Sequence, residues 1–362
     1  MRKNPPDFLL LLSVIILVGL GVIMVFSASE YSTLVRYNDS FYFFKRQLVW
    51  AAMGFVAMFV ALNYDYRRLR RWAGLALILA FVLLVAVFVP GVGRSSHGAS
   101  RWIGMGPLTF QPSELAKLCL ILFAAHHLAG ARGRIGEVRT WLPLLGVTAA
   151  AAGLVLAQPD LGSAASLTGT VMVMLFAAGL PWGHLLALGL AGTAAVAAAI
   201  CAESYRFRRF MAFLDPWRDP QGSGFHIIQS LYALGSGGLL GVGLGQGRQK
   251  LLYIPEQHTD FIFAVLGEEL GFVGTVLVIG LFLLFIWRGL RVAITSGDPF
   301  ATLLATGITA NIGLQAVVNI GVVTGSLPVT GITLPFISFG GTSLILSLVQ
   351  TGILLNTSRF AR

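Results

Sequence analysis

Charged residues are scarce in this sequence. Asp, Glu, Lys and Arg together make up 11% of its 362 residues, whereas hydrophobic residues make up 56% and the mean hydropathy is +0.81. In an ordinary soluble domain about a quarter of the residues are charged. This composition therefore excludes an ordinary soluble domain and indicates an integral membrane protein. Cysteine is equally rare. Cys119 and Cys201 show no metal-site spacing, and we interpret both as small core residues rather than as a disulfide.

Apolar runs long enough to cross a bilayer recur along the whole chain. A helix of about 20 apolar residues crosses roughly 30 Å of hydrocarbon. On this criterion the sequence predicts an all-α integral membrane protein with ten transmembrane helices. The expected spans are residues 8–28, 47–64, 72–93, 113–130, 142–157, 164–181, 183–201, 262–287, 300–323 and 335–355. A cleaved signal peptide is the alternative for the first run, but that run lacks an Ala-x-Ala exit and is long enough to span.

Basic residues set the expected orientation. With both termini in the cytoplasm, the short loops richest in arginine fall on the inside, as the positive-inside rule requires. Residues 202–261 then form a long extracytoplasmic loop between helices seven and eight of a single polytopic membrane domain, residues 1–362. The net charge of +10 does not require a nucleic-acid partner, because anionic lipid headgroups account for basic residues in cytoplasmic loops.

Four of the fifteen acids lie in residues 249–270, around the start of the eighth expected helix: Glu256, Asp260, Glu268 and Glu269. A carboxylate at the edge of a hydrocarbon span is costly unless it is paired or hydrated, which makes it a functional candidate. We select Asp260 as the candidate catalytic residue, a general base whose pKa the neighbouring phenylalanines would raise. The alternative is structural: Thr259 caps the helix, and Asp260 lies on its first turn beside the exposed amides.

The acids further along this helix have a different expected role. At about 100° per residue, Glu268 lies roughly 80° round the helix from Asp260, and Glu269 lies on the opposite face. We expect Glu269 to pair with another helix, and we favour a structural hydrogen-bonding role for both. The glycine-rich run 235–247 lacks the Gly-Lys-Ser/Thr ending of a nucleotide loop and predicts a bent or re-entrant element instead.

A second polar cluster lies at the start of the fourth expected helix. Ser113 is expected to cap this helix, with Glu114 and Lys117 one turn apart. A lysine inside a span needs a partner. Either Lys117 forms a closed ion pair with Glu114, or Lys117 and Arg101 together face a polyanion such as phosphate, and the residues alone leave both open.

Seven sequence blocks follow one another along nearly the whole chain: Arg101-Trp102, Gln111–Glu114 with Lys117, Gln158–Gly162, Asp215–Pro220, His258–Phe263, Gly267–Gly271 and Leu327–Gly341. In this order they resemble the shape, elongation, division and sporulation (SEDS) family of bacterial envelope proteins, whose members include FtsW, RodA and SpoVE. The Asp-Pro-Trp-Arg-Asp-Pro block looks more like the FtsW and SpoVE branch than like RodA. One departure is Phe339, where many relatives have tyrosine.

The resemblance implies a peptidoglycan glycosyltransferase that polymerises lipid II at the outer face of the bacterial cytoplasmic membrane, in cell division or sporulation. The family's essential aspartate corresponds to Asp260, which would deprotonate the acceptor 4-hydroxyl for an inverting attack that releases undecaprenyl pyrophosphate. Arg101 and Lys117 would engage the pyrophosphate or position the lipid-linked sugar, and Glu114 would hold this cluster in register. The remaining candidate substrate-binding residues are Trp102, His258, Glu256 and Lys250.

The resemblance also implies the cofactors and partners. No nucleotide or redox cofactor is required, because the leaving group carries the driving force, although a divalent cation, Mg²⁺ or Mn²⁺, near the pyrophosphate fits the chemistry. A class B penicillin-binding protein is the implied partner and would supply a transpeptidase. Two other functions stay open: a flippase or transporter of lipid-linked precursors, and a non-catalytic division scaffold. The chain shows no internal repeat, which disfavours transporters built from paired halves.

Overall fold

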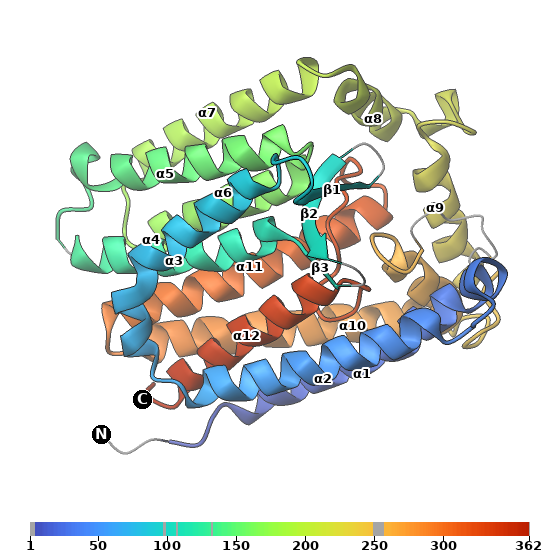
Figure 1. The fold of residues 1–362 in the computed structure, drawn as a ribbon, viewed down its shortest axis with the longest axis horizontal. Helices are drawn as coiled ribbons and strands as arrows, with labels where there is room; N and C mark the ends of the chain where they lie inside the picture. The colour runs from blue at the N-terminus through green and yellow to red at the C-terminus, as the bar shows by residue number, and fades with distance from the viewer. Residues whose placement is uncertain (1–3, 97–98, 106–107, 132, 249–256, 362) are drawn as a thin grey trace.

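The computed structural model describes residues 4–361 except 97–98, 106–107, 132 and 249–256. Most of the regular structure in this part of the chain is helical (Figure 1). The elements in chain order are α1 (Phe8–Tyr37), α2 (Tyr42–Asn63), α3 (Tyr66–Ala86), β1 (Gly93–Ser96), β2 (Ala99–Met105), β3 (Leu108–Phe110), α4 (Pro112–Gly130), α5 (Val138–Ala157), α6 (Leu161–Ala177), α7 (Trp182–Cys201), α8 (Ser204–Leu214), the short 3₁₀ helix η1 (Pro216–Arg218), α9 (Phe225–Gly237), α10 (Ile262–Thr295), α11 (Pro299–Val323) and α12 (Gly341–Ser358).

Helices dominate because a backbone inside lipid must satisfy its own hydrogen bonds. Each of the ten predicted apolar ranges overlaps a helix, namely α1 to α7 and α10 to α12, although the range 72–93 runs past the end of α3 and the range 335–355 starts before α12. Within the described residues, seven of these have the length and hydropathy of a membrane span: α1, α2, α3, α5, α7, α10 and α11. Helix α6 is shorter, and α12 carries buried polar residues such as Gln350 and Asn356. The predicted helical, multi-pass membrane architecture is therefore supported, with seven spans defined by composition.

Helix α11 lies inside the bundle. It contacts α4, α6, α10 and α12, and 72% of its most apolar window is buried within the protein. Its amide side chains are therefore surrounded by protein: Asn311, Gln315 and Asn319 are each at most 1% exposed. Because four residues make slightly more than one helical turn, these three amides follow one another along one side of α11.

Helix α7 lies at the opposite extreme, at the edge of the bundle (Figure 1). None of its residues is buried by protein. Cys201 at its end is exposed, so the prediction that this cysteine is a core residue is wrong, whereas Cys119 on α4 is buried as expected. Both cysteines are free thiols in the structure. A helix with so little protein contact leaves most of its surface to lipid.

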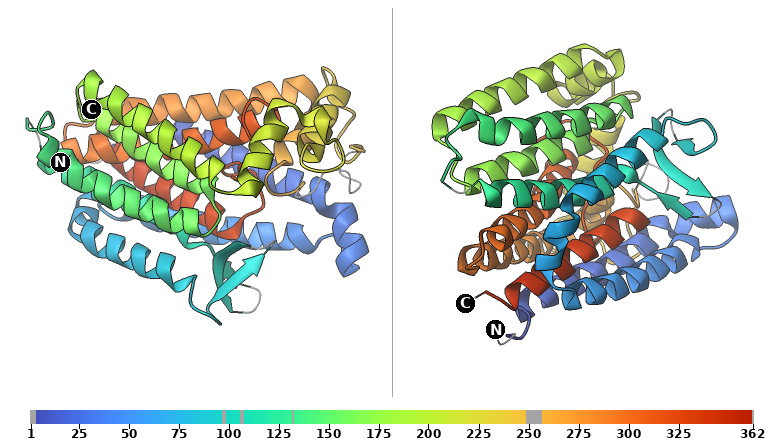
Figure 2. Two further views of the ribbon diagram at one scale, coloured as in Figure 1. Left: turned by 90° about the horizontal axis from the view of Figure 1, so that it is seen from above. Right: turned by 60° about the vertical axis from the view of Figure 1, so that its left-hand side comes forward.

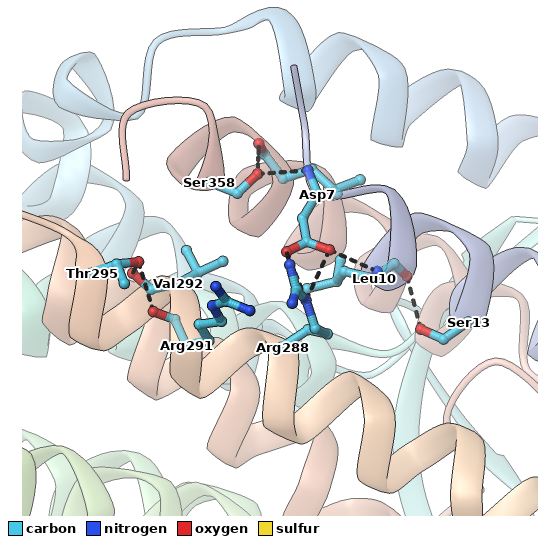
Figure 3. A network of polar contacts seen from close by, with 9 residues as sticks. Asp7, Leu10, Ser13, Arg288, Arg291, Val292, Thr295 and Ser358 are labelled. Atoms are coloured by element: carbon cyan, nitrogen blue, oxygen red, sulfur yellow. Dashed lines mark hydrogen bonds and ion pairs between the residues drawn. The ribbon is translucent and has the colours of Figure 1, made fainter. Parts of the chain in front are cut away.

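Both termini lie at the same end of the bundle, where Asp7 joins three helices (Figures 1 and 3). Asp7 caps α1 by accepting a hydrogen bond from the Leu10 amide at 3.1 Å. Its carboxylate also accepts from Nε of Arg288 on α10 at 2.9 Å, and its amide donates to Oγ of Ser358 on α12 at 3.1 Å. The acid and the guanidinium are 7% and 17% exposed, so this network fixes the ends of α1, α10 and α12 together.

The glycine-rich run begins in the last turn of α9 and packs against a break in α10. Gly271, within α10, has φ 65° and ψ −164°, which is not a helical conformation. At this break the amides of Val242 and Gly243 donate to the carbonyls of Glu268 and Glu269 at 3.0 and 3.1 Å. The bent element predicted from the glycines is thus a chain segment that crosses the broken helix at backbone contact.

Gly271→Ala is expected to destabilise the protein. A Cβ there would lie 2.2 Å from the Gly241 amide nitrogen, and the backbone conformation costs a residue with a side chain about 1–3 kcal/mol on its own. The apparent Tm of the purified protein in detergent measures the loss. Gly280→Ala in the same helix is the matched control, because nothing lies within 4 Å of its added Cβ. Equal Tm values for the two variants would contradict the expected strain.

A small antiparallel sheet, in the order β1-β2-β3, connects α3 to α4 at the periphery of the helix bundle (Figure 2). The all-α prediction did not include it, because strands of three to seven residues give little alternating signal in the sequence. Thr342 at the start of α12 holds the sheet in place. Its hydroxyl donates to the Thr109 carbonyl at 3.2 Å and accepts from the Gln111 amide at 3.3 Å.

The segment predicted as a long outer loop contains α8, η1 and α9. After α8 ends at Leu214, residues 215–224 form η1 and successive turns. Asp219 closes one of these turns by accepting hydrogen bonds from the Ser223 amide at 2.8 Å and the Ser223 hydroxyl at 3.0 Å. These bonds hold the pKa of the Asp219 carboxyl below its usual range.

Candidate active site

Asp260 lies in a short turn, residues 257–261, that leads into α10. Gln257 and Phe261 of this turn, and Ile262 after it, are at most 3% exposed, whereas Asp260 is only partly buried. Asp260 is therefore the one acid of this turn, and its carboxylate lies partly exposed next to buried residues.

The prediction that Thr259 caps a helix beginning at Asp260 is wrong. Helix α10 begins at Ile262, its N-cap residue is Phe261, and no side chain caps it. Asp260 consequently lies before the helix rather than on its first turn. The reason is tertiary: contacts with distant parts of the chain determine the backbone of this turn.

Three consecutive carbonyls of the turn, those of residues 258–260, accept hydrogen bonds from distant donors. In this order the donors are the Phe339 amide at 2.9 Å, the Ser338 hydroxyl at 2.7 Å and the side-chain amide of Asn319 at 2.8 Å. Ser338 is 4% exposed and Asn319 is 1% exposed, so both side chains donate from the protein interior. The backbone that carries Asp260 is therefore fixed on three successive residues.

Asn319 also joins this turn to the loop that follows α11. The same Nδ2 donates to the Asp260 carbonyl and, at 2.7 Å, to the Ile332 carbonyl. A buried carbonyl left without its donor costs about 1–3 kcal/mol. Together with the bonds from Ser338 and Phe339, which belong to the same loop, this side chain fixes the turn against the loop.

Arg101 approaches the same point from the sheet. It lies on β2, and its guanidinium donates to the carbonyls of Gln158, at 3.2 Å, and Pro159. A Cβ built on Gly331 would lie 3.5 Å from Oδ2 of Asp260 and 3.8 Å from Nη1 of Arg101, so both charged groups flank this glycine. Gly331 has φ +79°, a conformation that suits glycine. The site therefore combines a carboxylate and a guanidinium around a bare stretch of backbone.

Lys117 and Glu114 form the closed ion pair that was one of the two alternatives. Nζ of Lys117 lies 2.7 Å from Oε1 of Glu114 and 2.9 Å from Oε1 of Gln315, and the lysine side chain is 2% exposed. Gln315 precedes Asn319 by four residues on α11, which is about 6 Å along the helix. The pair therefore lies one turn deeper in the bundle than the residue that holds Asp260.

Ser113 does not cap α4, contrary to prediction. The helix begins at Pro112, and its N-cap residue is Gln111, with no side-chain cap. Proline is favoured at the first helical position because its fixed φ already suits the helix. Ser113 then falls within the first turn, and its Oγ is buried without a hydrogen-bond partner among the described residues.

The other predicted substrate-binding residues are distributed differently. Trp102 follows Arg101 on β2 and so points to the opposite face of the sheet. The ring of His258 stacks on Phe43, with centroids 4.3 Å apart, and packs against Phe339. Glu256 and Lys250 lie outside the described residues. Of this set, His258 is thus the residue that shares the turn of Asp260.

Glu268 and Glu269 have the structural contacts expected of them. Both oxygens of Glu269 accept from the Ser27 hydroxyl of α1, at 2.7 and 2.6 Å, so this acid does pair with another helix. Glu268 accepts from the Arg248 amide at 2.7 Å. Both acids are at most 2% exposed, and they hold the glycine-rich segment and α1 against α10.

Sequence reasoning missed Asn319, Ser338 and Gly331 as parts of this site. The latter two belong to the block 327–341, which carried the resemblance without a role for its residues. Asn319 had a usable signal: it is the third of three amides spaced four residues apart in an apolar run. Polar side chains that recur at each turn of a span indicate a face directed towards protein.

Within the described residues, no group of three or more His, Cys, Asp or Glu side chains is arranged to hold a metal ion. The described neighbourhood of Asp260 offers a carboxylate with a guanidinium beside it, which is not a donor set for a cation held by protein alone. The divalent cation therefore stays a prediction.

Fold and site together define a helical multi-pass membrane protein with a fixed, partly exposed carboxylate near one end of its bundle. The family model described as "Cell cycle protein", which covers FtsW, RodA and SpoVE, matches residues 8–362, and the chain belongs to this family. The predicted SEDS membership is thereby confirmed.

Individual relatives agree. The chain is 47% identical to stage V sporulation protein E of Bacillus subtilis (strain 168) over 100% of its own length and 99% of that protein. It is 46% identical to the probable peptidoglycan glycosyltransferase FtsW of Geobacter sp. (strain M18), with coverage of 99% and 98%. The chain also matches a solved structure described as "Structural coordination of polymerization and crosslinking by a peptidoglycan synthase complex". The two share 37% identity with a TM-score of 0.81, and the alignment covers 98% of both chains.

Proposed function

We propose that this chain is a peptidoglycan glycosyltransferase that polymerises lipid II. The observation that carries the proposal is the geometry of Asp260: a partly exposed carboxylate on a backbone fixed by three tertiary hydrogen bonds, next to the guanidinium of Arg101. A relative that is 46% identical is named as a probable peptidoglycan glycosyltransferase, which supports the same chemistry here.

In the proposed reaction Asp260 acts as a general base. Its carboxylate accepts the proton of the acceptor sugar's 4-hydroxyl as that oxygen attacks the donor's anomeric carbon. The new bond joins the acceptor oxygen to this carbon, the bond to the diphosphate oxygen breaks, and the electron pair leaves with undecaprenyl diphosphate. Attack from the face opposite the leaving group inverts the configuration. Fixing the carboxylate beforehand helps, because a general base must lie within hydrogen-bond reach of its proton.

Arg101 supplies positive charge where the diphosphate leaves. Its bonds to the Gln158 and Pro159 carbonyls hold the guanidinium next to Gly331, the glycine that Asp260 also flanks. Glu114 and Lys117 are positioning residues. Their ion pair contacts Gln315 of α11, the helix whose Asn319 binds the turn that carries Asp260. Trp102 and His258 remain candidates for sugar contacts, as do Glu256 and Lys250. A divalent cation, if one takes part, would be carried mainly by the diphosphate oxygens.

The topology proposed for this activity has ten membrane-spanning helices, α1 to α7 and α10 to α12, with cytoplasmic termini. Residues 202–261 then face the outside with Asp260, where lipid II is consumed. A class B penicillin-binding protein is the proposed partner. Support comes from the solved relative, which is described as part of a complex that couples polymerization with crosslinking.

Formation of glycan strands from lipid II is the direct test. The full chain, purified with a class B partner and given lipid II, is expected to release products that lysozyme degrades and that gel electrophoresis resolves as a ladder. Movement of lipid II across vesicle membranes without any polymer, under every partner condition tried, would show a transporter and refute the proposal.

A further inference from the structure

A pocket lies between α8 and the loop that follows α11. Its lining includes Tyr205, Arg206, Arg209 and Phe210 of α8, with Pro159 and Thr330 on the other side, and its volume is about 40 Å³. The residues that line it include two arginines and no acid. The pocket is therefore positively charged, with aromatic rings beside the charges.

This α8 pocket adjoins the candidate active site. Pro159 supplies one of the carbonyls that bind the Arg101 guanidinium. Thr330 directly precedes Gly331, the glycine flanked by Asp260 and Arg101. A ligand in the α8 pocket would thus lie beside the reacting groups, separated from them by the Arg101 side chain and residues 330–331.

The polar side chains of the pocket differ in whether they already have hydrogen-bond partners within the protein. Arg206 donates to the Tyr205 hydroxyl at 3.1 Å and to two backbone carbonyls, so its bonding is structural. Arg209 is exposed and lies over the Tyr205 ring at 5.8 Å, and in the described part of the chain its guanidinium has no hydrogen bond or ion pair. The Thr330 hydroxyl is shielded from solvent and also has no partner among the described residues. The exposed guanidinium of Arg209 can therefore donate to a ligand, and the Thr330 hydroxyl is an unpaired donor behind the pocket surface.

Helix α8 also indicates the depth of the pocket in the membrane. Phe207, Met211 and Leu214 recur at about one-turn intervals on this helix, and all three are exposed. A helix with an exposed apolar stripe and basic residues on another side lies in the interface between hydrocarbon and water. The apolar helix α7 leads directly into it. This arrangement puts Arg209 at the level of lipid phosphate groups.

We propose that the α8 pocket binds the diphosphate of the acceptor lipid-linked saccharide, an inference that rests on the proposed function. The donor's diphosphate is attached to the reacting carbon and so must lie beside Asp260 and Arg101. The acceptor's own diphosphate lies at the far end of its disaccharide from the attacking 4-hydroxyl. It therefore requires a second cationic site at the same membrane depth, and Arg209 provides the accessible cationic donor there.

The test compares two neighbouring arginines of α8. Arg209 lines the pocket, whereas Arg208 is exposed and does not. The full chain with its partner, in phosphatidylcholine vesicles, is assayed for polymerisation across a range of lipid II concentrations. Arg209→Gln is expected to raise the KM for lipid II about five- to tenfold with little change in kcat, because one charge-assisted hydrogen bond is lost. Arg208→Gln should match the wild type, and Arg209→Lys should recover part of the affinity.

Two further arms separate the possible failures. The first is direct binding of lipid II to the inactive Asp260→Asn protein, which needs no turnover. If the double variant Asp260→Asn with Arg209→Gln binds lipid II more weakly than Asp260→Asn alone, the pocket is supported even if polymerisation is never seen. An active wild type with the same KM in Arg209→Gln and Arg208→Gln would overturn the pocket and leave the function standing. Equal competition by phosphatidylglycerol would also overturn it, because the site would then be a general anionic-lipid site.

Discussion

Asp260→Asn is expected to lower glycan polymerisation by at least about 100-fold, the usual contribution of a positioned general base. Asparagine has almost the same shape but cannot accept the proton of the attacking hydroxyl. The fold should survive, because the turn is held through its backbone by Phe339, Ser338 and Asn319 rather than by a cap from Asp260. The rate of strand formation from lipid II measures the effect, and Tm in detergent reports the fold.

Asp39→Asn is the matched control for this change. Asp39 lies in the loop between α1 and α2 and forms an exposed pair with Lys45 at 3.0 Å, the kind of pair that contributes about 0–1 kcal/mol. This variant should polymerise at the wild-type rate. If Asp260→Asn kept more than a tenth of the wild-type rate with an unchanged Tm, the carboxylate would not be the base, and the mechanism would need another proton acceptor.

Most of the helical framework could be predicted from the sequence, because the signal is local. A run of apolar residues in lipid has few alternatives to a helix, and the eighth predicted span, residues 262–287, lies within α10, although the cap at Thr259 and a helix start at Asp260 were wrong. Less predictable were its end, which extends to Thr295, and the non-helical residue Gly271 within it. Both depend on which other segments pack against α10. The sheet before α4 escaped prediction because its short strands give little alternating signal, and Thr342, far away in sequence, holds it in place.

For the candidate site, too, the sequence predicted individual residues but not the contacts between them. Asp260 could be selected because an acid at the edge of an apolar span is unusual, and Arg101 because of its place in a family block. What the sequence could not reveal is how they meet. Gly331 lies between them, and Asn319 fixes the turn from α11. These contacts join residues that are far apart in the chain, so only the folded structure reveals them.

Lys117→Met is expected to cost about 3–5 kcal/mol of stability, because it leaves the Glu114 carboxylate buried without its cation. A large fall in Tm and in the yield of folded protein should follow. Lys45→Met is the matched control: it breaks an ion pair of similar length, but the Lys45 and Asp39 side chains are 66% and 36% exposed, so the change should cost at most about 1 kcal/mol.

The double variant Glu114→Gln with Lys117→Met separates the two roles considered for Lys117. Removing both charges eliminates the buried, unpaired carboxylate, and replacing a whole buried pair is often neutral or stabilising. Tm should therefore return most of the way to the wild-type value. If the pair acts only by holding α4 against α11, polymerisation should return with it. A double variant that is as stable as the wild type but inactive would mean that the ammonium acts on the substrate, and the positioning role proposed for Lys117 would then be wrong.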